Sequence, residues 1–372
     1  MDAATRIEPD LELVRELREL GGETFKRCSQ CATCSVTCHL GEGEYPRKEM
    51  LHAQWGLKDR LLGSLHPWLC YYCGECSRRC PREAEPGETM MTLRRWLTSR
   101  YDVTGISRLF YRSFKAELLV LITVALATGA GFLWYGFSHG DLQQYDGARA
   151  FLPSALVHRF DWTMAGTLVV LLGVNAARMW WFTTGRPRVP VPLGSYVRRL
   201  YTLPLHFITQ KRYATCDSKR PWAVHLALML SYLTLLTLIM FFLHAMQEGP
   251  AINWSVHVFG YAASFGLLAA VVIAVRGRLG GTHEQNRHSH DSDWLFLVML
   301  LLVTTTGVLQ HVLHRTGAGA AANIAYVVHL MLVVPMLVLE VPFGKWSHMV
   351  YRPLALYLAE LHRDARAEET RA

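Results

Sequence analysis

Eight cysteines, arranged in two copies of one spacing, carry most of the chemistry that this sequence can perform. Each run reads C-x2-C-x2-C-x3-C, and the runs comprise Cys28, Cys31, Cys34 and Cys38, and Cys70, Cys73, Cys76 and Cys80. Thiolates two residues apart on a turning backbone converge on one iron–sulfur cubane, whereas the fourth cysteine leaves on a helix and reaches the other cluster. We therefore predict two [4Fe-4S] clusters: cluster 1 on Cys28, Cys31, Cys34 and Cys80, and cluster 2 on Cys70, Cys73, Cys76 and Cys38.

A zinc site or a set of disulfides are the alternatives for these cysteines. Zinc usually takes its ligands in pairs rather than in triplets. Disulfides do not require two copies of one spacing and are rare in proteins exposed to the cytosol. The ninth cysteine, Cys216, stands outside both runs. Its position between apolar segments favours a structural role over that of a redox thiol.

Four histidines form a second group of candidate ligands, because they fall in or beside long apolar segments. Ionisable residues inside a membrane are costly and usually functional. Two antiparallel helices that offer imidazoles at two depths can bind two stacked b haems. The histidines form two sequence pairs, each 19 residues apart: His225 with His244, and His329 with His348. We predict that His225 and His348 bind the inner haem and that His244 and His329 bind the outer one.

The outer assignment has substitutes. Nineteen helical residues rise about 28 Å, which would separate the two haems widely unless the helices tilt. His257 and His311 lie on the same outer side as His244 and can replace it. Polar groups near the ends of the apolar segments are candidates for binding a quinone carbonyl, although each also fits a simple interfacial anchor: His257, Arg315 and Lys345.

Six apolar segments are long enough to position these histidines across a bilayer, which takes about 20 helical residues. They cover residues 116–135, 162–182, 222–246, 257–275, 294–314 and 321–341. The connection after the second segment is rich in Lys and Arg, whereas residues 247–256 contain neither. Positively charged loops stay in the cytoplasm, so both termini are expected there. A net charge of +8 can indicate nucleic-acid binding, but the Lys and Arg residues here lie beside apolar segments, which favours a membrane protein instead. The first twenty residues lack the apolar core of a cleavable signal peptide.

The polar N-terminal part must position the cysteines. The spacing of Leu13, Leu17 and Leu20 predicts an amphipathic helix over residues 10–20, and residues 46–62 also show a helical pattern between the two cysteine runs. Residues 90–112 are basic and amphipathic, and fit either a segment lying on anionic head groups or an ordinary solvated helix. The expected organisation is an N-terminal helix (1–21), an iron–sulfur domain (22–92), a basic linker (93–115), a transmembrane domain (116–352) and a cytoplasmic tail (353–372).

The paired cysteine runs with their helical insertion resemble the small iron–sulfur (C) subunit of heterodisulfide reductase. The stretches QKRYATCDSKRPWAVHL (210–226) and HLMLVVPMLVLEVPFGKWSHMV (329–350) resemble haem-binding helices of the membrane (E) subunit of heterodisulfide reductase and of the nitrate reductase gamma subunit. A fusion of these parts is similar to the C subunit of the quinone-interacting membrane-bound oxidoreductases. That resemblance implies an all-α, ferredoxin-like head on a six-helix b-type cytochrome, two haems b, and menaquinone as substrate. It also implies a location in the bacterial inner membrane and soluble, heterodisulfide-reductase-A-like flavoprotein partners that face adenylylsulfate reductase.

The resulting hypothesis is an electron-transfer subunit without substrate chemistry of its own beyond quinone redox. The sequence has no Rossmann glycine pattern and no credible Ser-His-Asp or paired-carboxylate site, so we assign no catalytic residue. One alternative is the membrane subunit of another heterodisulfide-reductase-like or sulfite-reductase-linked quinone complex. Another is a redox-sensing membrane anchor.

Overall fold

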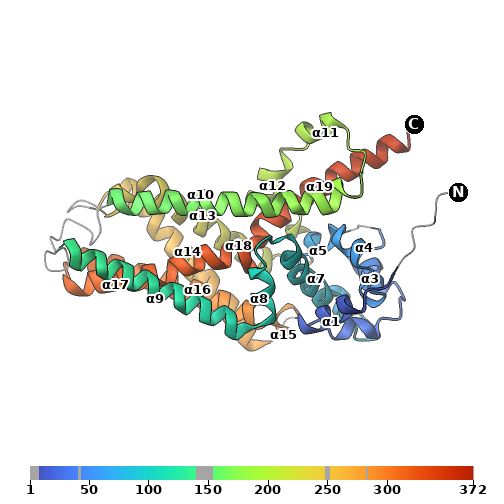
Figure 1. The fold of residues 1–372 in the computed structure, drawn as a ribbon, viewed down its shortest axis with the longest axis horizontal. Coiled ribbons are helices and arrows are strands. Elements are labelled where there is room, and N and C mark those ends of the chain that lie inside the picture. The colour runs from blue at the N-terminus through green and yellow to red at the C-terminus, as the bar shows by residue number, and fades with distance from the viewer. Residues whose placement is uncertain (1–7, 41–42, 140–153, 248–251, 282–283, 372) are drawn as a thin grey trace.

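The computed structural model describes residues 8–40, 43–139, 154–247, 252–281 and 284–371. Across these residues every regular element is helical, as the sequence predicts. The chain divides into a cysteine-bearing head at one end and a bundle of long helices at the other (Figure 1). The head lies at the end of the bundle where helix α9 (Phe114–His139) begins and helix α10 (Ser154–Trp180) ends.

The head is built from short helices around one core. Its first helix begins after Asp10, whose carboxylate accepts a hydrogen bond from the Leu13 backbone N–H (3.0 Å), a favourable N-cap. Leu13 and Leu17 are fully buried, which confirms the amphipathic pattern. The helices of the head are α1 (Leu11–Glu19), α2 (Thr33–Thr37), α3 (Arg47–Gln54), α4 (Lys58–Leu62), α5 (His66–Leu69), α6 (Glu75–Arg78) and α7 (Pro86–Tyr101).

The single helix expected over residues 46–62 is in fact two, α3 and α4. Gly56 separates them with φ +65°, a left-handed conformation that glycine adopts without steric cost. A Cβ atom at this position would lie 2.6 Å from the carbonyl oxygen of Asp10. The break thus lets the start of α1 pack closely against the connection between α3 and α4.

The basic linker expected over residues 93–115 differs from what the structure contains. Helix α7 runs through residue 93 without interruption and buries Leu93, Trp96 and Leu97 in the core of the head. It is followed by the short helix α8 (Ile106–Arg112). The basic residues of α7 do not face solvent as a group: Arg95 bonds Glu88 (3.1 Å) and the Leu20 carbonyl (2.7 Å). Sequence periodicity predicts that this helix has an apolar face, but it does not predict that the apolar face is buried in the core of the head.

Among the residues that the structure describes, six helices are long and apolar enough to cross a membrane, as the sequence predicts. They cover Phe114–Tyr135, Ala155–Gly185, Arg220–Met246, Trp254–Gly280, Asp291–Arg315 and Ala320–Phe343. The corresponding helices are α9 (Phe114–His139), α10 (Ser154–Trp180), α13 (Arg220–Gln247), α14 (Trp254–Gly280), α16 (Asp291–Arg315) and α17 (Ala320–Pro335). These helices expose many large apolar side chains, as a lipid-facing surface requires.

The last span is not one continuous helix. After Pro335 the chain forms a π-helical turn (Met336–Glu340) and then the short helix α18 (Val341–Phe343). Gly344 interrupts the path before the final helix, α19 (His348–Glu369). The distance calculated from 19 uninterrupted helical residues therefore does not apply between His329 and His348.

Helix α19 takes up the segment that the sequence suggests to be a tail. Instead of extending freely, it packs Tyr351, Leu358 and Leu361, each fully buried, into the core of the head. Asp364 on α19 accepts hydrogen bonds from Arg199 (2.6 Å) and Arg198 (2.9 Å), residues at the end of α11 (Leu193–Arg198). The C-terminal helix thus joins the head to the connection between the second and third spans.

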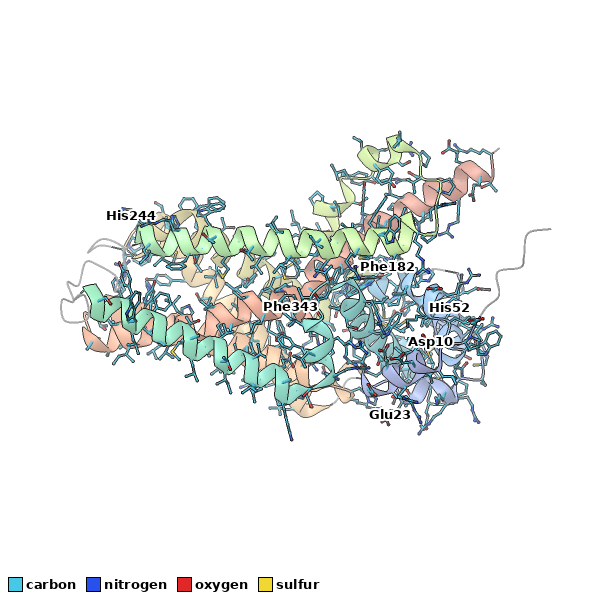
Figure 2. All side chains as sticks on the ribbon, viewed as in Figure 1. Asp10, Glu23, His52, Phe182, His244 and Phe343 are labelled. Carbon is cyan, nitrogen blue, oxygen red and sulfur yellow. The ribbon has the colours of Figure 1, made fainter. Side chains whose placement is uncertain are left out.

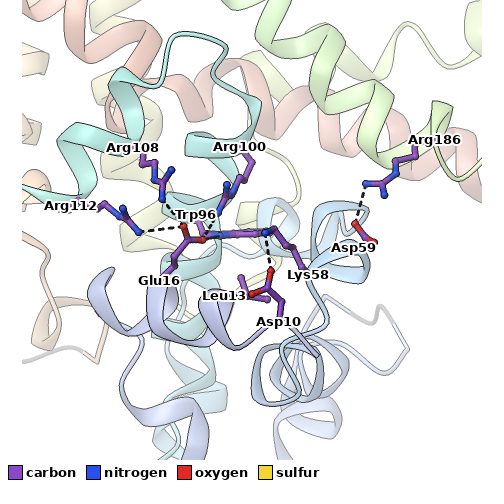
Figure 3. A network of polar contacts seen from close by, with 10 residues as sticks. All are labelled: Asp10, Leu13, Glu16, Lys58, Asp59, Trp96, Arg100, Arg108, Arg112 and Arg186. Atoms are coloured by element: carbon purple, nitrogen blue, oxygen red, sulfur yellow. Dashed lines mark hydrogen bonds and ion pairs between the residues drawn. The ribbon is translucent and has the colours of Figure 1, made fainter. Parts of the chain in front are cut away.

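Further polar contacts attach the head to the bundle. Buried Glu16 of α1 accepts hydrogen bonds from Trp96 (2.9 Å) and Arg100 on α7 and from Arg108 (3.1 Å) and Arg112 (3.3 Å) on α8 (Figure 3). At the end of the second span, Arg186 pairs with Asp59 of the head (3.0 Å). These contacts hold the cysteine-bearing head in one orientation against the membrane half.

Candidate iron–sulfur and histidine sites

The two cysteine runs adopt the same backbone geometry. Gln30 and Ala32 in the first run have φ +61° and +65°, and Tyr72 and Gly74 at the matching positions of the second have φ +55° and +84°. Ala32 precedes α2 and Gly74 precedes α6, so the third cysteine of each run lies in a short helix. This repeated left-handed turn allows three thiols to face one side of the chain.

Backbone amides point at the sulfur atoms in both runs. The Gln30 N–H bonds the Cys28 sulfur (3.5 Å), and the Tyr72 N–H bonds the Cys70 sulfur at the equivalent position (3.3 Å). A third amide, that of Ala84, bonds the Cys80 sulfur (3.3 Å). Hydrogen bonds to ligand sulfurs help set the reduction potential of an iron–sulfur cluster, so these turns can tune a cluster as well as hold it.

The first thiol group draws cysteines from both runs. Cys34 interacts electrostatically with Cys28, Cys31 and Cys80. The four cysteines predicted for cluster 1 also line one common cavity, together with Arg47 and Arg82: Cys28, Cys31, Cys34 and Cys80. Cys31 is exposed at its rim. The structure thus brings together the residues of the first predicted cluster.

The second thiol group is the reciprocal of the first. Cys38 interacts electrostatically with Cys70 and Cys73, although it belongs to the first run. Cys76 interacts with Cys70, Cys73 and Cys38. Cys38 of the first run thus lies near cysteines of the second run, and Cys34 is also a neighbour of Cys38 and Cys76, so the ligand assignment itself stays a prediction.

Burial opposes the ionisation of two of these thiols. Burial raises the pKa of Cys34 and of Cys38 to about 11, so neither is ionised near neutral pH without a partner. Metal binding deprotonates cysteine and offsets that cost. All nine cysteines are free of disulfides, and no three His, Cys, Asp or Glu side chains of the described ranges converge closely enough to hold a single metal ion. A zinc site requires such convergence, because each Zn–S bond is about 2.3 Å long, whereas each cysteine of a cubane binds its own iron.

Comparison with known proteins decides the nature of the head. Residues 22–85 match the family described as the 4Fe-4S dicluster domain. The head contains a 4Fe-4S dicluster domain, and it is similar in sequence to C subunits of heterodisulfide reductases. The chain is 34% identical over 109 residues to a protein of Archaeoglobus profundus described as like that C subunit, covering 28% of this chain and 58% of that protein.

Relatives from methanogens match a similar region. The C subunit of the H2:CoB-CoM heterodisulfide, ferredoxin reductase of Methanothermobacter thermautotrophicus is 32% identical over 78 residues, which is 20% of this chain and 42% of the relative. The iron–sulfur C subunit of the CoB–CoM heterodisulfide reductase of Methanopyrus kandleri is 33% identical over 87 residues, 20% of this chain and 45% of the relative. The chain thus spans about half the length of the curated relatives it matches. No solved structure matches it.

Outside the dicluster domain, the structure places the rings of His225 and His348 next to each other at the end of the bundle near the head, with their planes inclined by 57°. Their ring centres are 6.2 Å apart. Nδ1 of His225 donates to Oε1 of Gln210 (2.9 Å), and Nδ1 of His348 donates to the carbonyl oxygen of Lys345 (2.5 Å). With Nδ1 engaged in both rings, the two Nε2 atoms remain available as ligands, an orientation typical of metal-binding histidines.

The predicted outer histidines behave differently from the inner pair. His329 lies inside the bundle, where its Nδ1 contacts the Thr306 hydroxyl (3.0 Å), and Gly307 provides room for its ring: a Cβ there would lie 3.0 Å from Cε1. His244 follows a kink in α13 at Phe242 (φ −126°) and is exposed at the end of the bundle remote from the head (Figure 2). Of the two residues, only His329 is in the bundle interior, and no ring contact joins them in the parts of the chain that the structure describes.

The two substitute histidines contact each other instead. The ring centres of His257 and His311 are 5.6 Å apart. Nε2 of His257 lies 2.7 Å from the Arg315 guanidinium, and the Tyr261 hydroxyl lies 3.0 Å from Nε2 of His311. Two of the three candidate quinone contacts, His257 and Arg315, therefore belong to one polar group. The third, Lys345, is at the opposite end of the bundle, where it forms an ion pair with Asp293.

Sequence reasoning missed several residues of these sites. Gln210 and Tyr213 lie in the connection before the third span, yet Gln210 bonds His225 and the Tyr213 ring contacts it at 6.0 Å. Nothing in their spacing indicates this. Glu117 and Glu340, both buried near the ends of spans one and six, carried a signal that sequence reasoning did not use, because a carboxyl group inside a membrane segment is rare.

Proposed function

We propose that the protein is a membrane electron-transfer subunit that carries electrons between menaquinone and a soluble partner through two b haems and the two [4Fe-4S] clusters. The dicluster domain and the six membrane-type helices support the coarse form of this proposal. The observation that carries the haem part is the geometry of His225 and His348. Two metal–imidazole bonds of about 2 Å, with a ring radius beyond each, place ring centres about 6 Å apart, which agrees with the observed 6.2 Å.

The chain's own groups fit such a haem on further grounds. Both Nδ1 atoms have acceptors, so the Nε2 atom of each ring is left unprotonated and can act as a ligand. The acceptors also fix the ring planes and increase the basicity of the ligating nitrogens. A bound haem would supply one-electron chemistry, and these residues would hold and orient it.

The test of this haem is its loss on substitution. His348→Ala in the purified full chain should remove one b-type haem from the pyridine haemochrome count while both cluster EPR signals remain. His362→Ala is the matched control, because that histidine lies later on the same helix and bonds Thr184 (3.0 Å) rather than another ring. An unchanged haem count in His348→Ala, or the same loss in the control, would contradict the assignment.

For the second haem we propose His329 as one axial ligand, with His244 as the predicted partner and His257 or His311 as its substitutes. The interior position of His329 and the glycine facing its ring support the first part. The exposure of His244 does not by itself support the pairing. A series of alanine substitutions at the four positions, followed by haem counting, identifies the pair as the two variants that lose the same spectrum.

We propose the group around Arg315 as the site that contacts the quinone head group. Arg315, His257, Tyr261 and His311 lie at the end of the bundle remote from the head and offer several donors at one depth. Lys345 is a weaker candidate because its ammonium is already paired with Asp293. Arg315→Gln should raise the KM for a soluble menaquinol analogue with little change in haem content. An unchanged KM would exclude the site.

The soluble partner is proposed from resemblance and from the relatives' names. A fusion like that of the quinone-interacting membrane-bound oxidoreductases implies soluble heterodisulfide-reductase-A-like flavoproteins that deliver electrons to adenylylsulfate reductase or accept electrons from it. It also implies that this chain lies in a bacterial inner membrane, with its head and both termini in the cytoplasm. The relatives are components of heterodisulfide reductases, which favours membership in another complex of that type as the second candidate. Co-purification of the native complex, followed by identification of the flavoprotein, distinguishes the two.

A further inference from the structure

We infer that cluster 2, not cluster 1, is the cluster that exchanges electrons with the His225/His348 site, and that Tyr71, Tyr213 and Arg352 form the junction between them. The inference rests on the proposed function, and it adds the order of the redox centres and the residues that connect them. It is carried by a continuous set of contacts between the head and the membrane half.

The first part of the junction is a pair of stacked rings. Tyr71 directly follows Cys70, a predicted ligand of cluster 2. Its ring stacks on that of Tyr213 at 4.8 Å and 13°, and the Tyr213 ring meets His225 edge-on at 6.0 Å. Tyr71 and Tyr213 are both buried, and Tyr213 also lines an open pocket together with Cys73 and Cys216.

The second part is an arginine that joins the other histidine to the same cysteine. Arg352 lies four residues after His348 on α19, which is about one helical turn. Its guanidinium donates to the Cys70 carbonyl (3.0 Å) and lies 4.5 Å from the centre of the Tyr71 ring. Arg94 donates to the same carbonyl from the head side. One ligand residue of cluster 2 is therefore held by the helix that carries His348.

Neighbouring contacts close the junction. Cys216, which is buried, packs with the two tyrosines and with Cys73, another predicted ligand of cluster 2. His39, next to Cys38, pairs with Asp217 of the same connection (3.2 Å). Three of the four predicted ligands of cluster 2, or their chain neighbours, thus contact residues of the membrane half.

Cluster 1 has the opposite environment. Cys31 is exposed, and Val36, between the last two cysteines of the first run, is 86% exposed. Arg47 and Arg82 line the cavity of this thiol group. This placement leaves cluster 1 as the centre that faces a soluble partner, and the order becomes haem, cluster 2, cluster 1, partner.

The electron balance of the junction step is simple. A haem held by His225 and His348 would supply or take up one electron, and a cluster held by Cys70, Cys73, Cys76 and Cys38 would take up or supply that same electron, so the exchange would balance in either direction. No bond forms or breaks and no proton moves at the tyrosines. Their contribution is to keep the two centres in contact through packed rings rather than across a gap.

The test uses the full-chain complex reduced by a short-chain menaquinol analogue in rapid mixing, with haem absorbance and freeze-quench EPR as readouts. Tyr213→Leu should slow the reduction of cluster 2 several-fold while haem reduction keeps its rate. Tyr213→Phe, which retains the stacked ring, should behave as wild type. Tyr357→Leu replaces a tyrosine of equal burial whose hydroxyl bonds the Tyr196 carbonyl (2.8 Å) away from the junction, and it should also leave the rate unchanged.

Redox titration of Arg352 variants supplies the second measurement. Arg352→Gln removes a positive charge beside cluster 2, so the midpoint potential of cluster 2 should fall, and that of the inner haem with it; cluster 1 should not change. Arg352→Lys keeps the charge and should stay near wild type. If Tyr213→Leu fails to assemble, the arginine pair still decides: a shift confined to cluster 1 overturns the inference.

The outcomes separate this inference from the proposed function. Absence of haem from the wild-type chain overturns both. If haem and clusters are present, but the rate of electron transfer is unchanged in Tyr213→Leu and the midpoint potential of cluster 2 is unchanged in Arg352→Gln, the junction alone is overturned. Slower transfer in Tyr213→Leu but not in Tyr213→Phe supports it.

Discussion

The head and the membrane half are both built from helices, but the two sets of helices face different solvents. The head buries its large apolar residues, such as Trp68, Trp96 and Tyr101, and leaves its charges outside or paired. In the membrane half, Leu126 is 61% exposed and Val169 is 70% exposed near the middle of their spans. Because lipid replaces water around these spans, exposed leucine there has no hydrophobic cost. The same exposed fraction of an apolar side chain is therefore costly in the head and free of that cost in the membrane half.

The two halves also differ in how their candidate ligands are placed. In the head, each run of four cysteines is held by a turn of only a few residues, and the second run repeats the turn of the first. In the membrane half, each histidine pair joins helices far apart in sequence, as with His225 and His348. Local chemistry can therefore be inferred from spacing in the head, whereas in the bundle it depends on helix packing.

The largest expected effect is the loss of one cluster. Cys34→Ala should remove about half of the cluster-bound iron, because two cubanes with separate ligand sets are predicted. The signal of cluster 2 should remain in EPR. Cys216→Ala is the matched control, since its sulfur belongs to neither predicted set, and it should retain full iron content. Equal iron loss in both variants would mean that Cys216 is a ligand.

A second prediction compares His329 with His244. His329→Ala should remove one b-type haem, since the residue lies inside the bundle with its Nδ1 on Thr306. His244→Ala should lose the same haem if the predicted pair is correct. Low-temperature difference spectra measure both losses. Retention of full haem in His244→Ala would remove that residue from the pair and leave His329 with another partner.

A third prediction tests the contrast in solvent directly. Leu126→Lys places a charge at the lipid-facing middle of the first span, which should disfavour insertion by about 3 kcal/mol. Leu11→Lys, at an even more exposed position of the head (79%), should be close to neutral. The yield of membrane-inserted protein checks both variants. A similar yield for the two would show that residue 126 does not face lipid.

The smallest of the four effects concerns the Glu16 network in Figure 3. Glu16→Gln should destabilise the head by about 2 kcal/mol, the size expected for charged hydrogen bonds in a buried site. Glu19→Gln is the control, because its carboxylate is 48% exposed and its ion pair with Arg112 (3.2 Å) should contribute little. Denaturant-induced loss of cluster absorbance measures both. Equal midpoints for the two variants would contradict a structural role for Glu16.

The same network predicts a pH dependence. Burial opposes ionisation of Glu16, but the bonds from Trp96 and Arg100 and the charges of Arg100 and Arg108 hold its pKa below its usual value. A carboxyl whose pKa is lowered in the folded state stabilises the protein above the unfolded-state pKa, about 4.3, and loses that contribution as the pH falls through the folded value. The difference between wild type and Glu16→Gln should therefore be constant near neutral pH and shrink below about pH 4.

The sequence alone determined the helical class, the number of membrane spans and the division of the chain into a cysteine-bearing head and an apolar half. Those properties depend on composition and spacing over a few helical turns, as with the leucines of α1 and the repeated cysteine runs. It did not determine that residues 93–101 and α19 complete the head core, because a buried and a solvated amphipathic helix have the same periodicity.

Only the tertiary structure decided which distant residues meet. It placed His257 against His311, left His244 exposed, and set Tyr213 between Tyr71 and His225. The physical reason is that rotation and tilt of a membrane helix are fixed by its packing neighbours and not by its own apolar run. Likewise, the π-helical turn and the break at Gly344 interrupt the helix between His329 and His348, so counting residues along a straight helix does not give their separation.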